Sequence, residues 1–191
     1  MLKKTLILVL IIFSIFSTFN TFAYNSETFI PLDSKSWQGE GQLIFNSSFY
    51  LEWYPKEKGS LILTRKIPSN WESFNCIKFD CNSLANTGSW IYIMIGTDGN
   101  SYLYSYITIN WTGWKSFTLT FNELFSSFAK VGNPDLRKVK YLALQTHPDA
   151  FLNVSKCSIC ISNLRLSTYK DTNPNAYNFK LPTYKNKNLF F

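Results

Sequence analysis

Histidine is almost absent from this chain, since His147 is the only one among 191 residues. A catalytic base needs a nucleophile or an acid beside it, and no such partner is marked near His147, which precedes Pro148. Neither a G-x-S-x-G nor an H-E-x-x-H pattern occurs. We therefore expect His147 to be a polar residue of a loop or rim, and the chain not to be an enzyme.

Charged residues are also scarce, at 16% of the chain, and its twelve acidic residues are scattered. Paired carboxylates of the glycosidase type are not evident. The net charge of +7 is unevenly placed, because residues 169–191 hold four lysines against Asp171 alone. The positive net charge is thus mainly a property of the C-terminal tail. It gives little support to a nucleic-acid partner, and no nucleic-acid-binding motif is visible.

Only one apolar run approaches the length of a membrane span, and it lies at the N-terminus. Lys3 and Lys4 precede an apolar stretch over residues 6–16, and Ala23 follows at a position that signal peptidase reads. This pattern predicts a signal peptide over 1–23, secretion, and no membrane span after cleavage before Tyr24. A retained anchor is the alternative, but the stretch is short and polar residues follow it. The rest divides into a domain over 24–168 and a basic, Asn- and Lys-rich tail over 169–191.

Long helical patterns are missing as well. Aromatic residues make up 18% of the chain and β-branched residues are frequent, a composition that favours strands. Short strands between clusters of Gly, Pro, Asn and Ser predict an all-β sandwich or barrel. One helical turn is expected over 122–128. The predicted strands are 41–45, 50–54, 60–66, 76–82, 89–96, 102–109, 115–121, 141–146 and 156–166.

Two of these strands, 90–95 and 102–107, alternate between an aliphatic and an aromatic face. Side chains on a strand point to opposite faces with period two. The aliphatic set should pack into a core, and it comprises Ile91, Ile93, Ile95, Leu103, Ser105 and Ile107. The aromatic set should either stack against a ligand or pack beneath other residues, and it comprises Trp90, Tyr92, Met94, Tyr102, Tyr104 and Tyr106.

Four cysteines follow the signal peptide, and in an exported protein they predict disulfides. If strands 76–82 and 156–166 lie side by side and antiparallel, one register sets Cys81 opposite Cys157. The same register brings Cys76 within a diagonal step of Cys160. We therefore expect the bridges Cys81–Cys157 and Cys76–Cys160. A zinc site made of the four thiolates is the alternative.

Several motifs resemble those of a known family. Trp111-Thr112-Gly113-Trp114-Lys115 opens a predicted strand, Phe121-Asn122-Glu123-Leu124 follows it, and Asp135-Leu136 precedes the strand over 141–146. The closing strand carries Ile161-Ser162-Asn163-Leu164-Arg165-Leu166. In this order they resemble carbohydrate-binding modules with the galactose-binding-like jelly roll, which occur beside glycoside hydrolases and polysaccharide lyases. The resemblance implies a jelly-roll β-sandwich of two antiparallel sheets.

The resemblance also implies where a ligand would lie, on the concave face of one sheet. That sheet would contain strands 76–82, 89–96, 102–109 and 141–146. The alternation of side chains along these strands would set His147 on its outer face with the aromatic residues. The ligand-binding residues expected there are Trp90, Tyr92, Tyr102, Tyr104, Tyr106, Lys78, Asp80, Tyr141 and Gln145. Aromatic faces would stack on sugar rings, and the polar groups would contact hydroxyls. Trp111 and Trp114 are expected in the scaffold, and Trp37, Trp53 and Trp71 as core or loop anchors.

The sequence thus predicts a secreted, non-catalytic module that binds a polysaccharide or other glycan. The first alternative is a secreted module for protein interaction or structure without glycan binding, whose aromatic face is covered by the tail or by residues 24–38. The second is a small lyase that uses Tyr and His. The family often carries an Asp near a structural calcium where this chain has Ser162. No cofactor is therefore expected, although Asp33, Glu40 and Asp149 could supply oxygen ligands.

Overall fold

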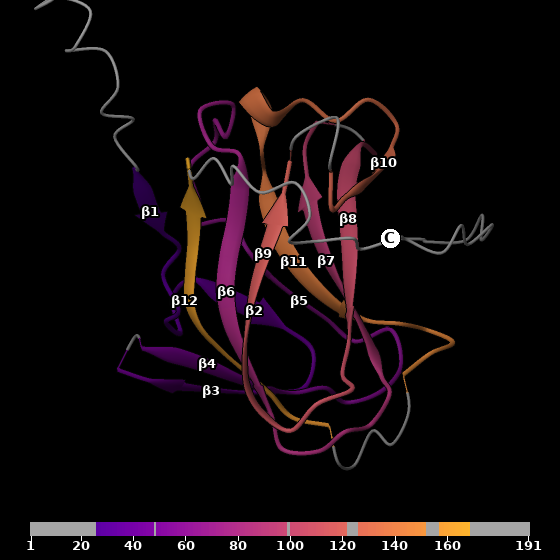
Figure 1. Cartoon of the computed structure of the whole chain (residues 1–191). Helices are drawn as coiled ribbons and strands as arrows, with labels where there is room; N and C mark the ends of the chain where they lie inside the picture. Colours follow the sequence, from indigo (N-terminus) through magenta and orange to yellow (C-terminus); the bar gives the residue numbers. More distant parts are fainter. Residues whose placement is uncertain (1–25, 48, 99, 122–125, 152–156, 169–191) are drawn as a thin grey trace, which may run out of the picture.

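The computed structural model describes residues 26–47, 49–98, 100–121, 126–151 and 157–168 (Figure 1). The signal peptide predicted over 1–23 and the tail over 169–191 lie outside these ranges. Within them the chain forms twelve strands and a short 3-10 helix, η1, over Leu136–Lys138. The strands are β1 Glu27–Phe29, β2 Trp37–Gly39, β3 Gln42–Asn46, β4 Tyr50–Tyr54, β5 Leu61–Thr64, β6 Cys76–Ser83, β7 Trp90–Gly96, β8 Tyr102–Thr108, β9 Gly113–Thr120, β10 Ala129–Val131, β11 Tyr141–Thr146 and β12 Ile159–Ser167.

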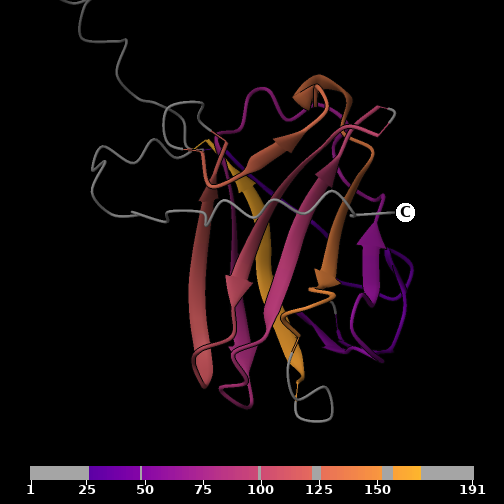
Figure 2. The same cartoon turned by 90° about the vertical axis from the view of Figure 1, so that its right-hand side faces the viewer.

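The strands form two antiparallel sheets that lie face to face as two layers (Figures 1 and 2). Sheet A has the order β3-β4-β12-β6-β9, with β1 added to β12. Sheet B has the order β10-β8-β7-β11-β5-β2. The predicted all-β jelly-roll sandwich with two antiparallel sheets is confirmed.

A bulge in β12 lets this strand pair with two different strands, β4 and β1, along the same edge. The register between β12 and β6 shifts between Ser162 and Arg165, and Asn163 adopts a left-handed backbone with φ of 52°. Asparagine tolerates this conformation better than most residues. Before the bulge β12 pairs with β4, and after it β12 pairs with β1. The bulge therefore divides the edge of sheet A between two short strands.

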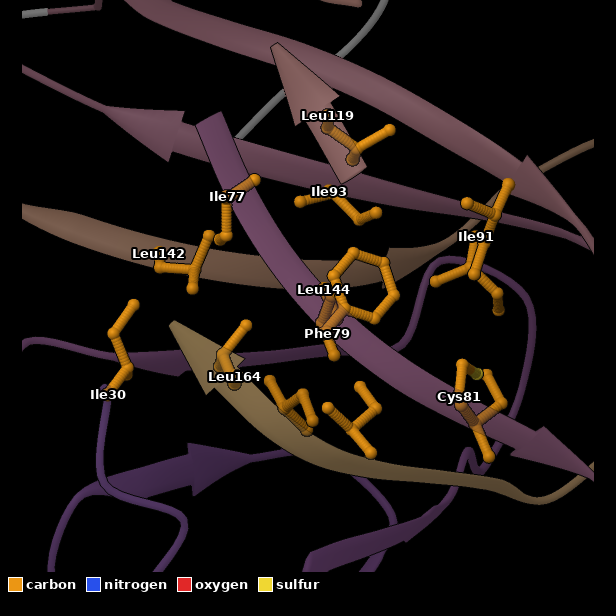
Figure 3. Packing of buried hydrophobic residues seen from close by; sticks show 14 of the residues in the cluster. Ile30, Ile77, Phe79, Cys81, Ile91, Ile93, Leu119, Leu142, Leu144 and Leu164 are labelled. Carbon is orange, nitrogen blue, oxygen red and sulfur yellow. The ribbon is translucent and has the colours of Figure 1, made fainter. Parts of the chain in front are cut away.

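The core lies between the sheets and is built by strand alternation. Ile91 and Ile93 of β7 lie in one cluster with Ile77 and Phe79 of β6 (Figure 3). Ile95 belongs to the same cluster, and all five are at most 4% exposed. The predicted aliphatic face of β7 and β8 is thus confirmed. Trp37, Trp53 and Trp71 are also buried in this core, as expected. Burial of such side chains contributes roughly 1.5–3 kcal/mol each to folding.

All nine predicted strands are present, and those over 50–54 and 141–146 have the predicted bounds. Strands β1, β2 and β10 are missed, because three residues are too few to show a period. The helical turn predicted over 122–128 falls partly outside the described residues. Its last three residues, 126–128, are not helical.

The predicted disulfides are not found. Cys76, Cys81, Cys157 and Cys160 are all free. Strand β6 does lie antiparallel to β12, but Cys81 pairs with Ile161, four residues beyond the predicted partner. Cys76 pairs with Ser167, which sets it roughly 23 Å along the strand from Cys160. A disulfide needs Cα atoms within about 7 Å, so the second bridge is excluded by register.

Candidate functional site

The outer side of sheet B gathers most of the aromatic residues that the sequence selected. The pairs Tyr92 with Tyr106 and Met94 with Tyr104 join β7 to β8, and Gln145 of β11 pairs with Tyr92. These side chains point away from the core because their neighbours Ile91, Ile93 and Ile95 point into it. We call this surface the aromatic face. It comprises Trp90, Tyr92, Met94, Tyr102, Tyr104, Tyr106, Tyr141, Ala143, Gln145 and His147.

The rings of the aromatic face contact one another across the strands. Trp90 stacks on Tyr106 with ring centroids 4.8 Å apart and planes at 15°. Tyr92 meets Tyr104 edge-on at 5.8 Å, and Tyr102 lies 6.1 Å from Tyr104. Such aromatic pairs contribute about 0.5–1.5 kcal/mol beyond their buried area. The face is therefore a continuous sheet of rings whose positions are fixed mutually.

Tyr141 extends this surface because its cross-strand partner has no side chain. Gly96 pairs with Tyr141 on β11 and with Tyr102 on β8. A Cβ at Gly96 would overlap the ring of Tyr141, so the ring lies directly on the glycine backbone. Burial raises the pKa of the Tyr141 hydroxyl above its ordinary value, with a further contribution from Tyr102. The glycine thus allows a flat aromatic surface to continue across three strands.

His147 belongs to the aromatic face, although the sequence analysis left it out of the binding set. Its ring stacks on Tyr92 at 4.9 Å and meets Trp90 edge-on at 5.3 Å. Its Nδ1 accepts hydrogen bonds from the backbone N–H groups of Asp149 and Ala150, at 3.0 and 2.9 Å. The neutral ring therefore carries its proton on Nε2.

Burial lowers the pKa of His147, and the nearby charge of Asp149 opposes this shift. The side chain is only 3% exposed, which agrees with the lowered pKa. His147 does lie in the loop that follows β11, as expected, but it is buried rather than at an exposed rim. Its place on the outer face agrees with the alternation expected from the sequence, because His147 continues the series 141, 143, 145 of β11.

Exposure differs among the rings. Trp90, Tyr104 and Tyr141 are half-buried, whereas Tyr92, Tyr102 and Tyr106 are only 8%, 6% and 8% exposed. Tyr92, Tyr106, Met94 and Ala143 form a second apolar cluster outside the main core. Burial raises the pKa of the Tyr102 and Tyr106 hydroxyls. In this structure the more accessible rings of the aromatic face are therefore Trp90, Tyr104 and Tyr141.

The predicted place of Lys78 and Asp80 beside the aromatic residues is wrong. Both lie on β6, which belongs to sheet A, so the other layer separates them from the aromatic face. The alternation of side chains along a strand, which we call strand parity, determines which residues share a face of that strand. It does not determine which sheet the strand joins.

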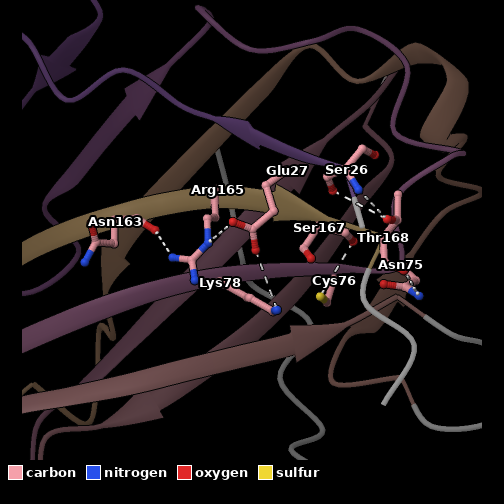
Figure 4. A network of polar contacts seen from close by, with 9 residues as sticks. All are labelled: Ser26, Glu27, Asn75, Cys76, Lys78, Asn163, Arg165, Ser167 and Thr168. Atoms are coloured by element: carbon pink, nitrogen blue, oxygen red, sulfur yellow. Dashed lines mark hydrogen bonds and ion pairs between the residues drawn. The ribbon is translucent and has the colours of Figure 1, made fainter. Parts of the chain in front are cut away.

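Lys78 and Asp80 instead tie sheet A together through polar contacts. Glu27 of β1 is 3.8 Å from the Lys78 amine and 3.0 Å from Nε of Arg165 on β12 (Figure 4). Asp80 accepts hydrogen bonds of 2.6 Å from Ser116 and from Asn163, and these bonds lower its pKa. These residues join β1, β6, β9 and β12.

Trp114 also differs from the expectation of a scaffold residue. It lies on the outer side of sheet A, paired with Asn82, and is 55% exposed. Trp111 is half-buried, packs against the core, and donates its indole N–H to the carbonyl oxygen of Gly113 at 3.0 Å. The scaffold role expected for both tryptophans fits only Trp111.

The described ranges give little support to a metal site, a ligand cavity or a membrane span. No group of three or more His, Cys, Asp or Glu side chains there could hold a metal ion. Between the sheets lies an apolar cavity of about 10 Å³, lined by residues such as Ile93 and Leu144, which is far smaller than a sugar ring. No helix among the described residues is long and apolar enough to cross a membrane.

The fold is shared with known carbohydrate-binding modules. The family 11 module of the cellulosomal cellulase Lic26A-Cel5E of Clostridium thermocellum superposes with a TM-score of 0.50 at 16% identity, over 74% of this chain and 94% of that module. A family 29 module in complex with cellulohexaose gives 0.51 at 13% identity, over 76% of this chain and 93% of the module. These similarities define the class of fold, the β-sandwich of carbohydrate-binding modules.

The same fold is found within larger enzymes. An agarase, AgWH50C, matches with a TM-score of 0.59 at 13% identity, over 76% of this chain. This chain spans only 25% of the agarase. No protein-family model and no curated protein sequence matches the chain.

Proposed function

We propose that this protein is a secreted, non-catalytic module that binds a polysaccharide on its aromatic face. The observation that carries the proposal is the row of cross-strand rings on β7 and β8, in which Trp90 and Tyr104 are accessible and held by Tyr106 and Tyr92. Sugar rings expose patches of C–H groups that pack on aromatic faces. The fold supports this proposal, because the modules that share it include one in complex with cellulohexaose.

The polar groups around the rings suit hydroxyl recognition. Gln145 is half-buried beside Tyr92 and donates its side-chain N–H to the carbonyl oxygen of Gly59 at 3.2 Å. Its amide oxygen remains an acceptor for a sugar hydroxyl. The residues that form the aromatic face include no carboxylate, so it offers neither the acid nor the nucleophile of a glycosidase. Binding without hydrolysis is the function that these side chains support.

Affinity electrophoresis through gels containing soluble polysaccharides tests the proposal. Glucans, mannans and agarose form a suitable panel, because relatives of the fold are described with cellulohexaose, with mannohexaose and as an agarase. We expect at least one polymer to retard the protein, and Tyr104→Ala to reduce the retardation. Trp114→Ala is the matched control, since it removes an exposed ring from the other sheet. Equal retardation of both variants would refute the assignment of the aromatic face.

One observation favours the alternative of a module that binds no glycan. Tyr92, Tyr102 and Tyr106 are buried, as expected if the rings serve packing alone. Cross-strand aromatic pairs stabilise sheets without any ligand. If this alternative holds, no polysaccharide in the panel retards the protein, and Tyr104→Ala lowers only the thermal midpoint of unfolding.

A further inference from the structure

One arginine of the chain differs from the others in its surroundings. The sequence holds three arginines, Arg65, Arg137 and Arg165. The side chain of Arg137 lies 2.9 Å from Asp135, and that of Arg165 lies 3.0 Å from Glu27. Arg65 is exposed, and no carboxylate of the described ranges forms an ion pair with it. Arg65 is therefore the arginine whose guanidinium can receive an acidic group of a ligand.

Arg65 lies on the same side of sheet B as the aromatic face. The register between β5 and β11, continued by one residue, sets Arg65 opposite Tyr141. The preceding Thr64 is 0% exposed on the core side, so alternation directs Arg65 outward. Tyr141 pairs with Gly96, and Gly96 pairs with Tyr102. One cross-strand row of the outer face thus runs from Tyr102 through Gly96 and Tyr141 to Arg65.

The guanidinium of Arg65 and the ring of Tyr141 are neighbours in this row. Residues directly opposite each other on adjacent strands have Cβ atoms about 4.5–5.5 Å apart. Burial and Tyr102 raise the pKa of the Tyr141 hydroxyl, and the charge of Arg65 opposes this shift. The ring itself leans over Gly96 and so does not cover Arg65. A sugar ring stacked beside Tyr141 therefore has a guanidinium within reach of its substituents.

The loops at this end of sheet B add positive charge. Lys138 and Lys140, which lead into β11, share the single carboxylate of Asp98 at 3.7 and 3.3 Å. One carboxylate neutralises only one of the two amines. The Lys140 N–H donates to the Gly96 carbonyl oxygen, so these loops adjoin the row that contains Tyr141. An excess of positive charge therefore surrounds the Tyr141 end of the aromatic face.

The opposite end of the aromatic face shows no such excess. There Lys56 and Lys58 are balanced by Glu57 and Asp149, and all four residues are exposed. A strand spans about 20 Å between positions 141 and 147, which is about twice the Debye length at physiological salt. The two ends therefore act separately on a bound ligand. An anionic group is favoured at the Tyr141 end.

We propose that Arg65 binds an acidic substituent of the polysaccharide, a carboxylate or a sulfate ester, on a sugar that packs beside Tyr141. The inference rests on the proposed function and narrows its ligand to an anionic polysaccharide. A guanidinium is planar and presents paired N–H donors that match two oxygens of one acidic group. Carboxylates and sulfate esters share this chemistry, and the experiment has an arm for each.

Matched polymers with one backbone test the inference. Each polymer of the panel is compared, in soluble form, with a carboxymethylated and a sulfated derivative by isothermal titration calorimetry in about 0.15 M salt. We expect at least one derivative to bind about tenfold more tightly than its neutral parent, as a charge-assisted hydrogen-bonded pair would give. The derivative that gains affinity identifies the acidic group. If no derivative of any backbone gains affinity, the inference is wrong.

Variants of Arg65 separate a specific contact from the general attraction between a basic protein and an anionic polymer. Arg65→Gln should remove the gain and leave the affinity for the neutral parent unchanged. Lys58→Gln is the matched control, because it removes the same charge from an exposed residue at the other end of the face. Arg65→Lys keeps the charge without the paired donors and should retain only part of the gain. Equal losses in Arg65→Gln and Lys58→Gln would overturn the assignment to Arg65.

Failure of this inference and failure of the proposed function give different results. If the neutral parents bind and Tyr104→Ala weakens them, but no derivative binds better, the aromatic face stands and Arg65 has no part in recognition. If no polymer binds, neutral or anionic, the proposed function fails and the inference fails with it. Binding of the derivatives alone, weakened both by Arg65→Gln and by Tyr104→Ala, would support the two together.

Discussion

Ser105 is a polar residue in an apolar place. It lies on the core side of β8, is 0% exposed, and its hydroxyl has no hydrogen-bond partner. An unsatisfied buried hydroxyl costs about 1–3 kcal/mol. We therefore expect Ser105→Ala to raise the free energy of unfolding by about 1 kcal/mol in urea titrations.

Ser60, in the loop just before β5, is a matched control for Ser105. Ser60 is equally buried, but its hydroxyl accepts a hydrogen bond of 2.9 Å from the Glu57 N–H. Ser60→Ala should lower the free energy of unfolding by about 1 kcal/mol, because it leaves that donor unpaired. If Ser105→Ala is destabilising to the same extent as Ser60→Ala, the account of Ser105 is wrong.

His147 should give the protein a pH-dependent stability. Its folded-state pKa is lowered by burial, and its Nδ1 must stay unprotonated to accept two backbone hydrogen bonds. The unfolded chain then binds the proton more readily, so this contribution is complete above about pH 6.5 and is lost as pH falls through the lowered pKa.

The variant His147→Asn isolates this contribution, because its amide oxygen can accept the same bonds and does not titrate. We expect the stability of the native chain to fall relative to the variant between about pH 6.5 and pH 5 in urea titrations. His147 is the only histidine, so no other imidazole contributes. A constant difference between the two proteins over this range would contradict the predicted shift.

At the scale of elements, β7 and β11 are coupled through one glycine. A Cβ at Gly96 would overlap the Tyr141 ring, so Gly96→Ala should displace that ring and lower stability by about 1–3 kcal/mol. In a Tyr141→Ala background the same change should cost much less. A double-mutant cycle in urea measures this coupling, and additive effects would show that Tyr141 does not lie on the glycine.

Strand parity explains both what the sequence could predict and what it could not. Alternation identified the core side of β7 and β8, because Ile91 and Ile95 differ in chemistry from Tyr92 and Met94. An even shift of the register between two strands leaves the same residues on the same face. The register between β6 and β12 is shifted by four residues, so Cys81 pairs with Ile161 and not with Cys157. The faces were therefore predicted correctly while the cysteine pairs were wrong. The sheet that Lys78 and Asp80 join is set by long-range pairing, which local pattern does not encode.

Two residues of the site show a further limit of local pattern. Trp114 occupies the strand position that the resemblance assigns to the scaffold, yet it is exposed. His147 was set apart because no catalytic partner was marked near it, yet it stacks on Tyr92 within the aromatic face. In both cases the surroundings come from neighbouring strands, so they become visible only once the sheets are assembled.

At the scale of the whole molecule, the two outer surfaces of the sandwich have different chemistry. Sheet A carries ion pairs of Glu27 with Lys78 and Arg165, and hydrogen bonds from Ser116 and Asn163 to Asp80. Sheet B carries a continuous surface of aromatic rings on β7 and β8. The polar side stabilises the assembly of strands, and the aromatic side is the surface that we propose for the polysaccharide.

Isothermal titration calorimetry with the polysaccharide that binds best tests the central proposal most directly. We expect Tyr104→Ala, compared with the native chain, to weaken binding by about tenfold, which corresponds to about 1.4 kcal/mol for the loss of one ring contact. Trp114→Ala should bind as the native chain does. If Tyr104→Ala keeps native affinity, or if Trp114→Ala loses it instead, the polysaccharide does not bind on the aromatic face.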